Sequence, residues 1–453
     1  MSKETARRSK AERKEDKTGS NNANMDNNLN MEDKTQEYQE QYAAMVKSTP
    51  ELPDLVIYQI LQLLSTRYAI RASILSKQWE RVWSLIPLLD FDEEEQHGDH
   101  VFQHDKFEYF VTNCLRRHEK DHKQEYLDKF RLRTRYYGYE NLINQCLSFA
   151  IWKKVKQLDL SLYTTHNLSY PLYNLPHTVL NAKSLTSLNL ESVAISWGWG
   201  FQHVRLPSLK SMSLKEVLVD EFAFVKLILG CPSIESLSID SCGGLSRVDV
   251  SSSSLKSLEV IRGFTEYELT VKAANLESFR LGDSVHHVSG NDDFNERRGT
   301  IIETPKLRSC EFIGYWQTGF SLNAPKLSEA TIILGDRADS YFNTFPHNPK
   351  MRNFLGQFDC SGKMSLHVMD AETIIVPKEL RRSSTTLFPP LPSLKNLQVI
   401  ITSPTLVSDS TLRNSLRRMA PALDREGLSI QKKSCWRLHV KELIDLCDGN
   451  FVD

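Results

Sequence analysis

LPDLVIYQILQLLSTRYAIRASILSKQWERVW, spanning Leu52–Trp83, is the stretch around which the rest of this chain is organised. Its apolar residues recur at the spacing of three short amphipathic helices. Pro53 and Asp54 suit the first turn of the first helix. Thr66 and Ser76 are of the residue types that cap the next two. Three short helices bury little surface alone, so this sequence predicts either a partner that covers them or packing on the rest of the chain.

The composition indicates an ordinary soluble protein. Of the 453 residues, 40% are apolar and 25% charged, and the formal net charge of −1 gives no overall field for nucleic acid. No apolar run approaches the roughly 18–20 residues that span a bilayer, and the N-terminus lacks the apolar core of a secretory signal. The eight cysteines form no Cys-x-x-Cys pair, which favours a reducing compartment. We therefore expect a protein of the nucleus, the cytoplasm or both, with no membrane or nucleic-acid partner.

The residues before the helical stretch differ in character from those within it. Residues 1–47 are polar, rich in Asn and mixed in charge, and are predicted to be disordered. Five basic residues there fit a nuclear import signal: Arg7, Arg8, Lys10, Arg13 and Lys14. Acidic residues interrupt this run, which favours a solvated tail instead. The helical stretch with its flanks is predicted to form a domain over residues 48–95.

A leucine-rich repeat follows. In the template Leu-x-x-Leu-x-Leu, the last two apolar residues alternate along a short strand and point inward. Repeats that start at positions 185, 209, 234, 255 and 276 step by 24, 25, 21 and 21 residues, within the roughly 20–29 of this class. Further matches begin at Leu127, Val155, Leu307, Leu327 and Leu394. The sequence thus predicts an α/β solenoid with parallel strands on a concave face and helices and loops outside, including helices at 141–152 and 220–229.

The predicted solenoid covers residues 101–403 and contains two irregular parts. An insertion is expected near 284–300, because the repeat spacing lengthens there. Degenerate repeats are expected over 336–390, with Lys363–Val368 as the best strand candidate. Residues 404–453 are expected to form a cap or a tail.

One short motif suggests zinc chemistry. A helix is predicted from Phe107, and His118 to His122 then match His-Glu-x-x-His, a spacing that places two imidazoles on one helix face. The neighbouring Arg and Lys residues indicate a solvated segment, and no convincing third ligand follows. The sequence also lacks a phosphate-binding loop and a nucleophile-elbow motif. We therefore expect no metal, no cofactor, no catalytic residue and no enzyme activity.

The helical stretch resembles the F-box of plant F-box/leucine-rich-repeat proteins. The resemblance lies in LPDLVIYQILQLL, the Ala69-Ile70-Arg71 turn, the segment Ser73–Trp79, and Trp83, Pro87 and Leu89-Asp90-Phe91. Gly230-Cys231-Pro232 and the strand after it resemble the same family. Gln78 and Tyr68 depart from it, since a basic and an acidic residue are common at these places.

This resemblance implies a partner. The expected partner is a Skp-family adaptor, and through it a cullin–RING ubiquitin ligase. The residues expected to form or support the adaptor surface are Leu52, Pro53, Ile57, Ile60, Leu61, Leu64, Ile70, Leu75 and Trp79.

The concave residues of the repeats suggest how a protein substrate binds. The first repeat is basic, with Lys129, Arg131 and Arg133, and later repeats place Ile261, Ile313 and Ile333 on the same face. An acidic part of the substrate is expected at the basic strand and an apolar part at the isoleucines. The simpler alternative is that a loop or the C-terminal segment covers the isoleucines.

Three functions fit these observations. The first is a substrate-recognition subunit that holds a target on its repeats while the helices dock to the ligase. The second is a small-molecule sensor whose ligand completes the substrate site. The third is a repeat scaffold unconnected with ubiquitin.

Overall fold

The computed structural model describes residues 52–95, 100–120, 126–163, 171–196, 203–262, 267–283, 299–314, 319–335, 349–375, 389–402 and 407–432. The predicted tail of residues 1–47 lies outside them, as do residues 284–298 of the predicted insertion and the residues after Lys432.

Three helices open the described chain, as predicted: α2 (Asp54–Gln62), α3 (Thr66–Ser73) and α4 (Lys77–Trp83). They enclose a small core of their own, made of Ile57, Leu61, Ala69, Val82 and Ile86. Ser76 caps α4 as expected, since its side chain accepts a hydrogen bond from the Trp79 N–H. The N-cap of α3 is Ser65, not the predicted Thr66.

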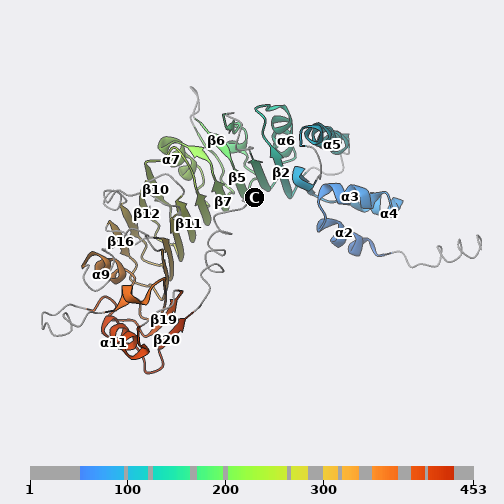
Figure 1. Cartoon of the computed structure of the whole chain (residues 1–453). Helices are drawn as coiled ribbons and strands as arrows, with labels where there is room; N and C mark the ends of the chain where they lie inside the picture. The colour runs from blue at the N-terminus through green and yellow to red at the C-terminus, as the bar shows by residue number, and fades with distance from the viewer. Residues whose placement is uncertain are drawn as a thin grey trace, which may run out of the picture.

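One parallel sheet of thirteen strands runs through the molecule. Its strands, in spatial order, are β1 (Leu88–Asp92), β2 (Lys129–Arg135), β3 (Gln157–Tyr163), β5 (Ser187–Glu191), β7 (Ser211–Lys215), β9 (Ser236–Asp240), β11 (Ser257–Arg262), β13 (Ser278–Asp283), β15 (Ser309–Gly314), β17 (Glu329–Leu334), β18 (Lys363–Val368), β19 (Asn396–Ile401) and β20 (Leu428–Lys432). The sheet lines the inner side of an arc, with α2–α4 at one end and α11 at the other (Figure 1). Every repeat predicted from the leucine pattern has its strand here, including Lys363–Val368.

The two end strands were not predicted as part of this sheet. β1 lies inside the predicted N-terminal domain, yet it pairs in parallel with β2 from Leu88↔Lys129 to Asp92↔Arg133. β20 lies in the predicted C-terminal cap and pairs with β19. The solenoid sheet therefore begins earlier and ends later than the repeat pattern indicates.

The strands exist because alternate residues are apolar and enter the core. In β9, for example, Leu237 and Ile239 are fully buried while Ser238 and Asp240 face the concave side. Short parallel strands stacked in register let each repeat bury its leucines against the next one. The concave face is therefore built from the residues between the leucines.

Helices and two smaller parallel sheets form the outer layer (Figure 1). The outer helices are α5 (His100–Lys120), α6 (Asn141–Trp152), α7 (Glu221–Leu229) and α9 (Pro349–Gly356), and α11 (Asp409–Met419) lies at the last repeats. One small sheet consists of β4 (Tyr173–Asn174), β6 (Val193–Ile195) and β8 (Leu218–Val219). The other consists of β10 (Arg247–Ser251), β12 (Glu268–Lys272), β14 (Thr300–Glu303) and β16 (Phe320–Asn323). Single 3-10 turns are η1 (Glu93–Glu95), η2 (Val179–Asn181) and η4 (Ala371–Ile374).

The outer layer confirms two predictions and contains elements that were not predicted. Helix 141–152 is present, and helix 220–229 is present with Asp220 as its N-cap. The helix expected from Phe107 begins earlier, at His100. The outer sheets β4–β6–β8 and β10–β12–β14–β16 and helix α9 were not predicted. None of the helices in the described ranges is both long and apolar enough to cross a membrane.

Candidate docking site on the N-terminal helices and its joint with the repeats

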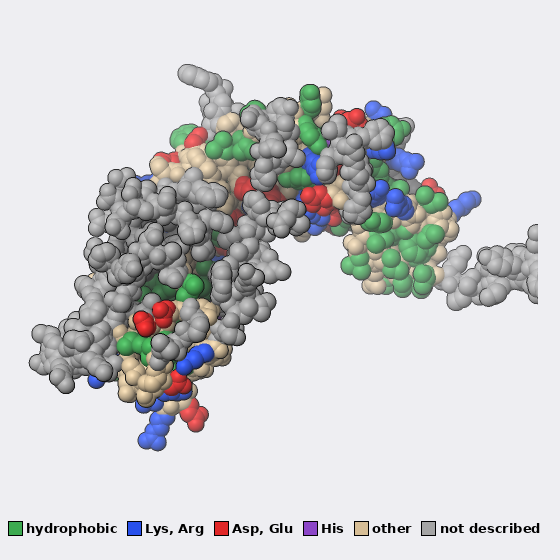
Figure 2. Space-filling model, viewed as in Figure 1, with side chains coloured by type: hydrophobic (Ala, Val, Ile, Leu, Met, Phe, Trp, Pro, Cys, Tyr) green, Lys and Arg blue, Asp and Glu red, His purple; other side chains and the backbone are tan. Residues whose placement is uncertain are grey.

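Apolar side chains gather on the surface of the N-terminal helices (Figure 2). Eight large ones are exposed there: Leu52, Leu55, Ile60, Leu63, Tyr68, Ile74, Leu75 and Leu85. Leu63 and Ile74 keep 86% and 81% of their surface. We call these eight residues the exposed apolar set. So much apolar surface on a segment of this size is typical of a site that another protein covers.

The structure divides the nine predicted adaptor residues into three groups. Leu52, Pro53, Ile60 and Leu75 are exposed, and Leu64, Ile70 and Trp79 are partly buried. Ile57 and Leu61 are buried inside the helices' own core, at 0% and 1% exposure.

Ile57 and Leu61 were expected to form or support the adaptor surface, and their burial leaves them only the supporting position beneath it. α2 is apolar nearly all round, so the sequence alone did not distinguish its inner face from its outer face. Leu55, Leu63 and Ile74 are exposed residues that the prediction missed. Whether the exposed residues bind an adaptor stays a prediction.

Gln78 fixes the start of α2 against α4. Its Nε2 donates to the Leu52 carbonyl oxygen and to Asp54 Oδ1, both at 2.8 Å. Arg81 Nη2 donates to Asp54 Oδ2 at 2.9 Å. The Gln78 hydrogen bond, with a smaller contribution from Arg81, lowers the pKa of the Asp54 carboxyl. The departure from the family pattern at Gln78 thus has a structural role, because it holds Leu52 in place.

The N-terminal helices are joined to the repeats by β1. Thr66 Oγ1, on α3, accepts a hydrogen bond from the Asp90 N–H at 2.7 Å. Beyond β1, the buried Glu93 carboxylate accepts from Thr134 Oγ1 at 2.7 Å and from the Arg135 N–H at 2.8 Å. Sequence reasoning missed this joint, because each contact links residues far apart in the chain.

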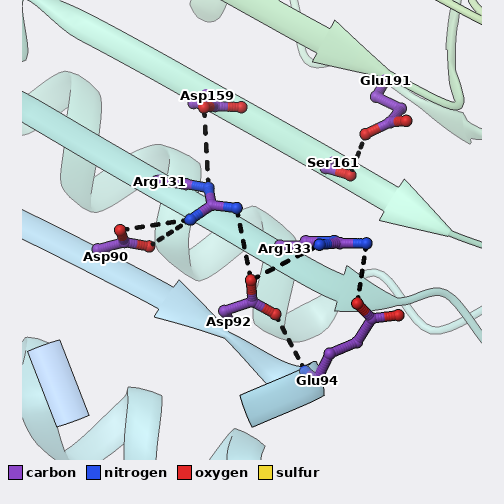
Figure 3. Close-up of polar contacts among 8 residues, drawn as sticks. All are labelled: Asp90, Asp92, Glu94, Arg131, Arg133, Asp159, Ser161 and Glu191. Atoms are coloured by element: carbon purple, nitrogen blue, oxygen red, sulfur yellow. Dashed lines mark hydrogen bonds and ion pairs between the residues drawn. The ribbon is translucent and has the colours of Figure 1, made fainter. Parts of the chain in front are cut away.

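Two arginines of the basic first repeat form ion pairs with acidic residues from β1 and its neighbours (Figure 3). Arg131 lies 3.3 Å from Asp90, 3.4 Å from Asp92 and 3.9 Å from Asp159, measured between nitrogen and carboxylate oxygen. Arg133 lies 2.8 Å from Glu94.

The pKa of Asp159 reflects two opposing effects in this cluster, burial and nearby positive charge. Burial raises the pKa of Asp159, and the charges of Arg131 and Lys129 only partly oppose that rise. Arg131 and Arg133 thus already have acidic partners, and the charge of Lys129 opposes the rise in the pKa of Asp159. That an acidic part of a substrate binds at Lys129, Arg131 and Arg133 stays a prediction.

The apolar part of the predicted substrate surface is also closed. Ile261 and Ile313 keep only 8% and 6% of their surface, and Ile333 is half-buried. In the strand register Gly282 lies between Ile261 and Ile313, and an added Cβ at Gly282 would lie 3.5 Å from Ile261 Cγ1. Neighbouring strands bring these side chains close enough to pack on one another. The expectation of an exposed apolar surface at Ile261 and Ile313 is therefore corrected.

His118 has a packing role. It was expected in a solvated segment, but it is 7% exposed and its ring contacts Trp83 edge-on, with centroids 5.2 Å apart. This contact places α5 against the end of α4. His122 lies outside the described residues. Within the described ranges, no three His, Cys, Asp or Glu side chains come together in a way that would hold a metal ion.

Comparisons with known proteins agree with this architecture. An F-box domain model matches residues 50–91, and the family described as "FBD-associated F-box protein At5g56370, LRR repeats" matches residues 143–339. The FBD-associated F-box protein At4g13985 of Arabidopsis thaliana is 32% identical over 246 residues, which are 51% of this chain and 51% of that protein. The FBD-associated F-box protein At5g22730 of Arabidopsis thaliana is 26% identical over 359 residues, which are 77% of this chain and 67% of that protein.

A third relative, the F-box/FBD/LRR-repeat protein At4g00160 of Arabidopsis thaliana, is 27% identical over 293 residues, 63% of this chain and 55% of that protein. The aligned region thus spans between about half and two thirds of these relatives' own length. The F-box match covers the helices that carry the exposed apolar set, and the repeat match covers the middle of the solenoid. The chain is therefore similar to plant F-box/leucine-rich-repeat proteins in both of its parts.

Proposed function

We propose that this chain is a substrate-recognition subunit of an SCF-type ubiquitin ligase. An F-box domain indicates adaptor function in general. The finer proposal is that α2–α4 dock to a Skp-family adaptor, which connects to a cullin–RING ligase, and that the repeats hold a target protein. The chain performs no chemistry in this proposal, and acts by holding the target near the ligase in the nucleus or the cytoplasm.

The observation that carries the proposal is the exposed apolar set. Large apolar side chains that stay exposed in the free chain gain roughly 1.5–3 kcal/mol each when a partner buries them fully. Ile57 and Leu61 beneath them form a core that holds the helices in one arrangement. A preformed surface binds with less loss of conformational entropy than one that must order on binding.

A single charge placed on this surface tests the docking role. We expect Leu63→Asp to weaken binding of a purified plant Skp-family adaptor by about 10-fold or more, because a buried carboxylate without a partner is costly. Leu63 is 86% exposed in the free chain, so the fold tolerates the change. Isothermal titration calorimetry measures the affinity, and thermal unfolding checks the fold.

Leu229→Asp provides the matched control. Leu229 is 66% exposed at the end of α7, on the repeats. It receives the same new charge outside the F-box, and adaptor affinity should not change. Equal affinities for Leu63→Asp and Leu229→Asp would show that the exposed apolar set is not the docking surface. The double variant Leu52→Ala, Pro53→Ala tests another part of the same surface in the same assay.

A further inference from the structure

We propose that the edge of the repeats next to the F-box helices contacts an acidic surface of the docked adaptor. The inference rests on the proposed function, because it extends the adaptor site from α2–α4 onto the solenoid. This edge lies where the strands β2, β3 and β5 begin. Its exposed basic and aromatic side chains are Tyr126, Trp152, Lys154, Lys156 and Lys183, and we call these five residues the basic rim.

Hydrogen bonds join the three segments that carry the basic rim. The Leu127 N–H donates to the Lys153 carbonyl oxygen at 3.1 Å, which ties the segment before β2 to the segment before β3. Ser184 Oγ donates to the Val155 carbonyl oxygen at 2.9 Å, which ties the segment before β5 to the same place. The basic rim is therefore one surface across three neighbouring repeats.

The basic rim is continuous with the F-box helices. The Pro87 carbonyl oxygen accepts hydrogen bonds from the Asp128 N–H at 2.7 Å and from the Lys129 N–H at 3.2 Å. Leu85, two residues before Pro87, belongs to the exposed apolar set and keeps 53% of its surface. The exposed apolar set and the basic rim therefore meet where the chain enters β1.

One partner is large enough to cover both surfaces. β1 and β5 are three strand spacings apart in the sheet, which is roughly 14 Å. A specific interface covers about 800 Å² of each partner, a patch roughly 30 Å across. Interfaces of this kind have an apolar centre and a polar periphery. The exposed apolar set would form the centre, and the basic rim would form one side of the periphery.

Positive charge is in surplus on this edge. The described residues directly before the three strands, 126–128, 153–156 and 183–186, contain four lysines and one acidic residue, Asp128. Asp128 is already paired, because Lys156 Nζ lies 2.8 Å from its carboxylate. Among the described residues, no carboxylate lies within ion-pair distance of Lys154 or Lys183. This edge therefore attracts an acidic surface and repels a basic one.

The F-box helices carry charge of the same sign. Between residues 52 and 86 there are four basic residues, Arg67, Arg71, Lys77 and Arg81, and two acidic residues, Asp54 and Glu80. Asp54 is paired with Arg81 at 2.9 Å. An adaptor that covers these helices and the basic rim together therefore meets positive charge on both parts.

Two exposed aromatic rings accompany the lysines. Lys154 Nζ lies 5.1 Å from the centre of the Tyr126 ring, and Lys153 Nζ lies 4.7 Å from that of Trp152. Tyr126 and Trp152 keep 51% and 55% of their surface. A cation–π contact orients an ammonium group without neutralising it, so its N–H donors can still bind a carboxylate. Aromatic side chains are also enriched in protein interfaces.

Reversing two charges of the basic rim tests the inference. We expect the double variant Lys154→Glu, Lys183→Glu to slow association with a purified plant Skp-family adaptor by about 5-fold or more at about 50 mM salt, because peripheral charges act mainly on the association rate. The difference from the wild type should shrink at about 500 mM salt, where exposed charges are screened. Surface plasmon resonance measures the rates, and thermal unfolding checks the fold.

The double variant Lys306→Glu, Lys326→Glu provides the matched control. Both lysines are exposed and lie three residues before β15 and β17, as Lys154 lies three residues before β3. β15 is eight strand spacings from β1, roughly 38 Å, so this control should associate at the wild-type rate. Equal slowing in the two double variants would show that only overall charge matters, and would overturn the inference.

The F-box variants keep this inference separate from the proposed function. If Leu63→Asp loses adaptor binding while Lys154→Glu, Lys183→Glu associates at the wild-type rate, the docking role stands and only the role of the basic rim is contradicted. If Leu63→Asp and Leu229→Asp bind the adaptor equally well, the docking role itself is contradicted, and the inference falls with it.

Discussion

A single hydroxyl links the F-box helices to the sheet. Thr66 is 2% exposed, and its Oγ1 accepts from the Asp90 N–H at 2.7 Å. The residue type suggested a helix cap, but Ser65 occupies the N-cap of α3. No local pattern reveals the contact, because it depends on β1 lying beside α3. Sequence periodicity predicted the helix correctly and the role of its first residue wrongly.

Thr66→Val should destabilise the chain by about 1–3 kcal/mol, because the shape is kept while a buried N–H loses its acceptor. Thr186→Val is the control, since Thr186 Oγ1 donates to the Lys156 carbonyl oxygen at an exposed site. The control should cost less than about 0.5 kcal/mol. Chemical denaturation measures both variants. Equal destabilisation would mean that the Thr66 hydrogen bond contributes little.

Glu93 and His104 make the joint sensitive to pH. Burial alone would raise the pKa of Glu93, but hydrogen bonds from His104, the Arg135 N–H and Thr134 outweigh it and lower the pKa. Burial alone would lower the pKa of His104, but Glu93, helped by Glu108 and Asp105, raises it. Each group therefore favours the charged form of the other.

The signs of these shifts define a pH window. The lowered pKa of Glu93 gives stability that is complete above its ordinary value of 4.5 and is lost as pH falls through the lowered pKa. The raised pKa of His104 gives stability that is complete below 6.5 and is lost as pH rises through the raised pKa. The pair should stabilise most between about pH 4.5 and 6.5.

His104→Gln tests the upper limit of this window. The difference in unfolding free energy between wild type and variant should shrink as pH rises above 6.5, because the wild type loses its charged histidine. Denaturant titrations from pH 6 to pH 9 measure it. A difference that stays constant over this range would show that the His104 charge does not stabilise the joint.

Among the secondary-structure elements, β1 belongs both to the F-box segment and to the repeat sheet. The motif Leu89-Asp90-Phe91 resembles the end of an F-box, and the structure uses it as the first strand of the repeat sheet. The leucine template predicted the inner strands because their apolar residues recur at fixed spacing. It did not predict the outer sheet β10–β12–β14–β16, whose strands have four or five residues and no such template.

Deletions should show to which unit β1 belongs. A chain lacking residues 1–95 loses β1 and exposes the edge of β2, and an exposed strand edge favours pairing with another copy of the chain. A chain lacking residues 1–84 keeps β1 on that edge. Size-exclusion chromatography should find more association, and thermal unfolding lower stability, for the shorter chain. The opposite order would mean that β1 contributes little to the repeats.

The whole molecule joins an F-box to a solenoid in which each repeat contacts its neighbours. Regular spacing is visible in sequence, so the solenoid was predictable. The charge balance of the concave face was not, because Arg131 and Asp90 are 41 positions apart and meet only through the pairing of β1 with β2. The same reason explains why the sequence did not reveal the acidic partners of Arg131 and Arg133.

Leu237→Ala tests whether the repeats and the F-box helices are stabilised independently of each other. Leu237 is 1% exposed in β9, and its truncation should destabilise the repeats by about 2–5 kcal/mol. Adaptor affinity should stay unchanged, because α2–α4 have a core of their own at the other end of the arc. Denaturation and adaptor titration on one sample measure both. A parallel fall of the two would contradict this separation.

The parallel pairing of β1 with β2 has a consequence for a chain that is cut. The chain leaves the sheet after Asp92 and re-enters it at Lys129 on the adjacent strand, so the peptide backbone is not the only connection between the two parts. The strand ladder, the Thr66 hydrogen bond and the Arg131 ion pairs are further ties. Cleavage at a site-specific protease target inserted between positions 96 and 99 should yield two fragments that remain associated as one particle.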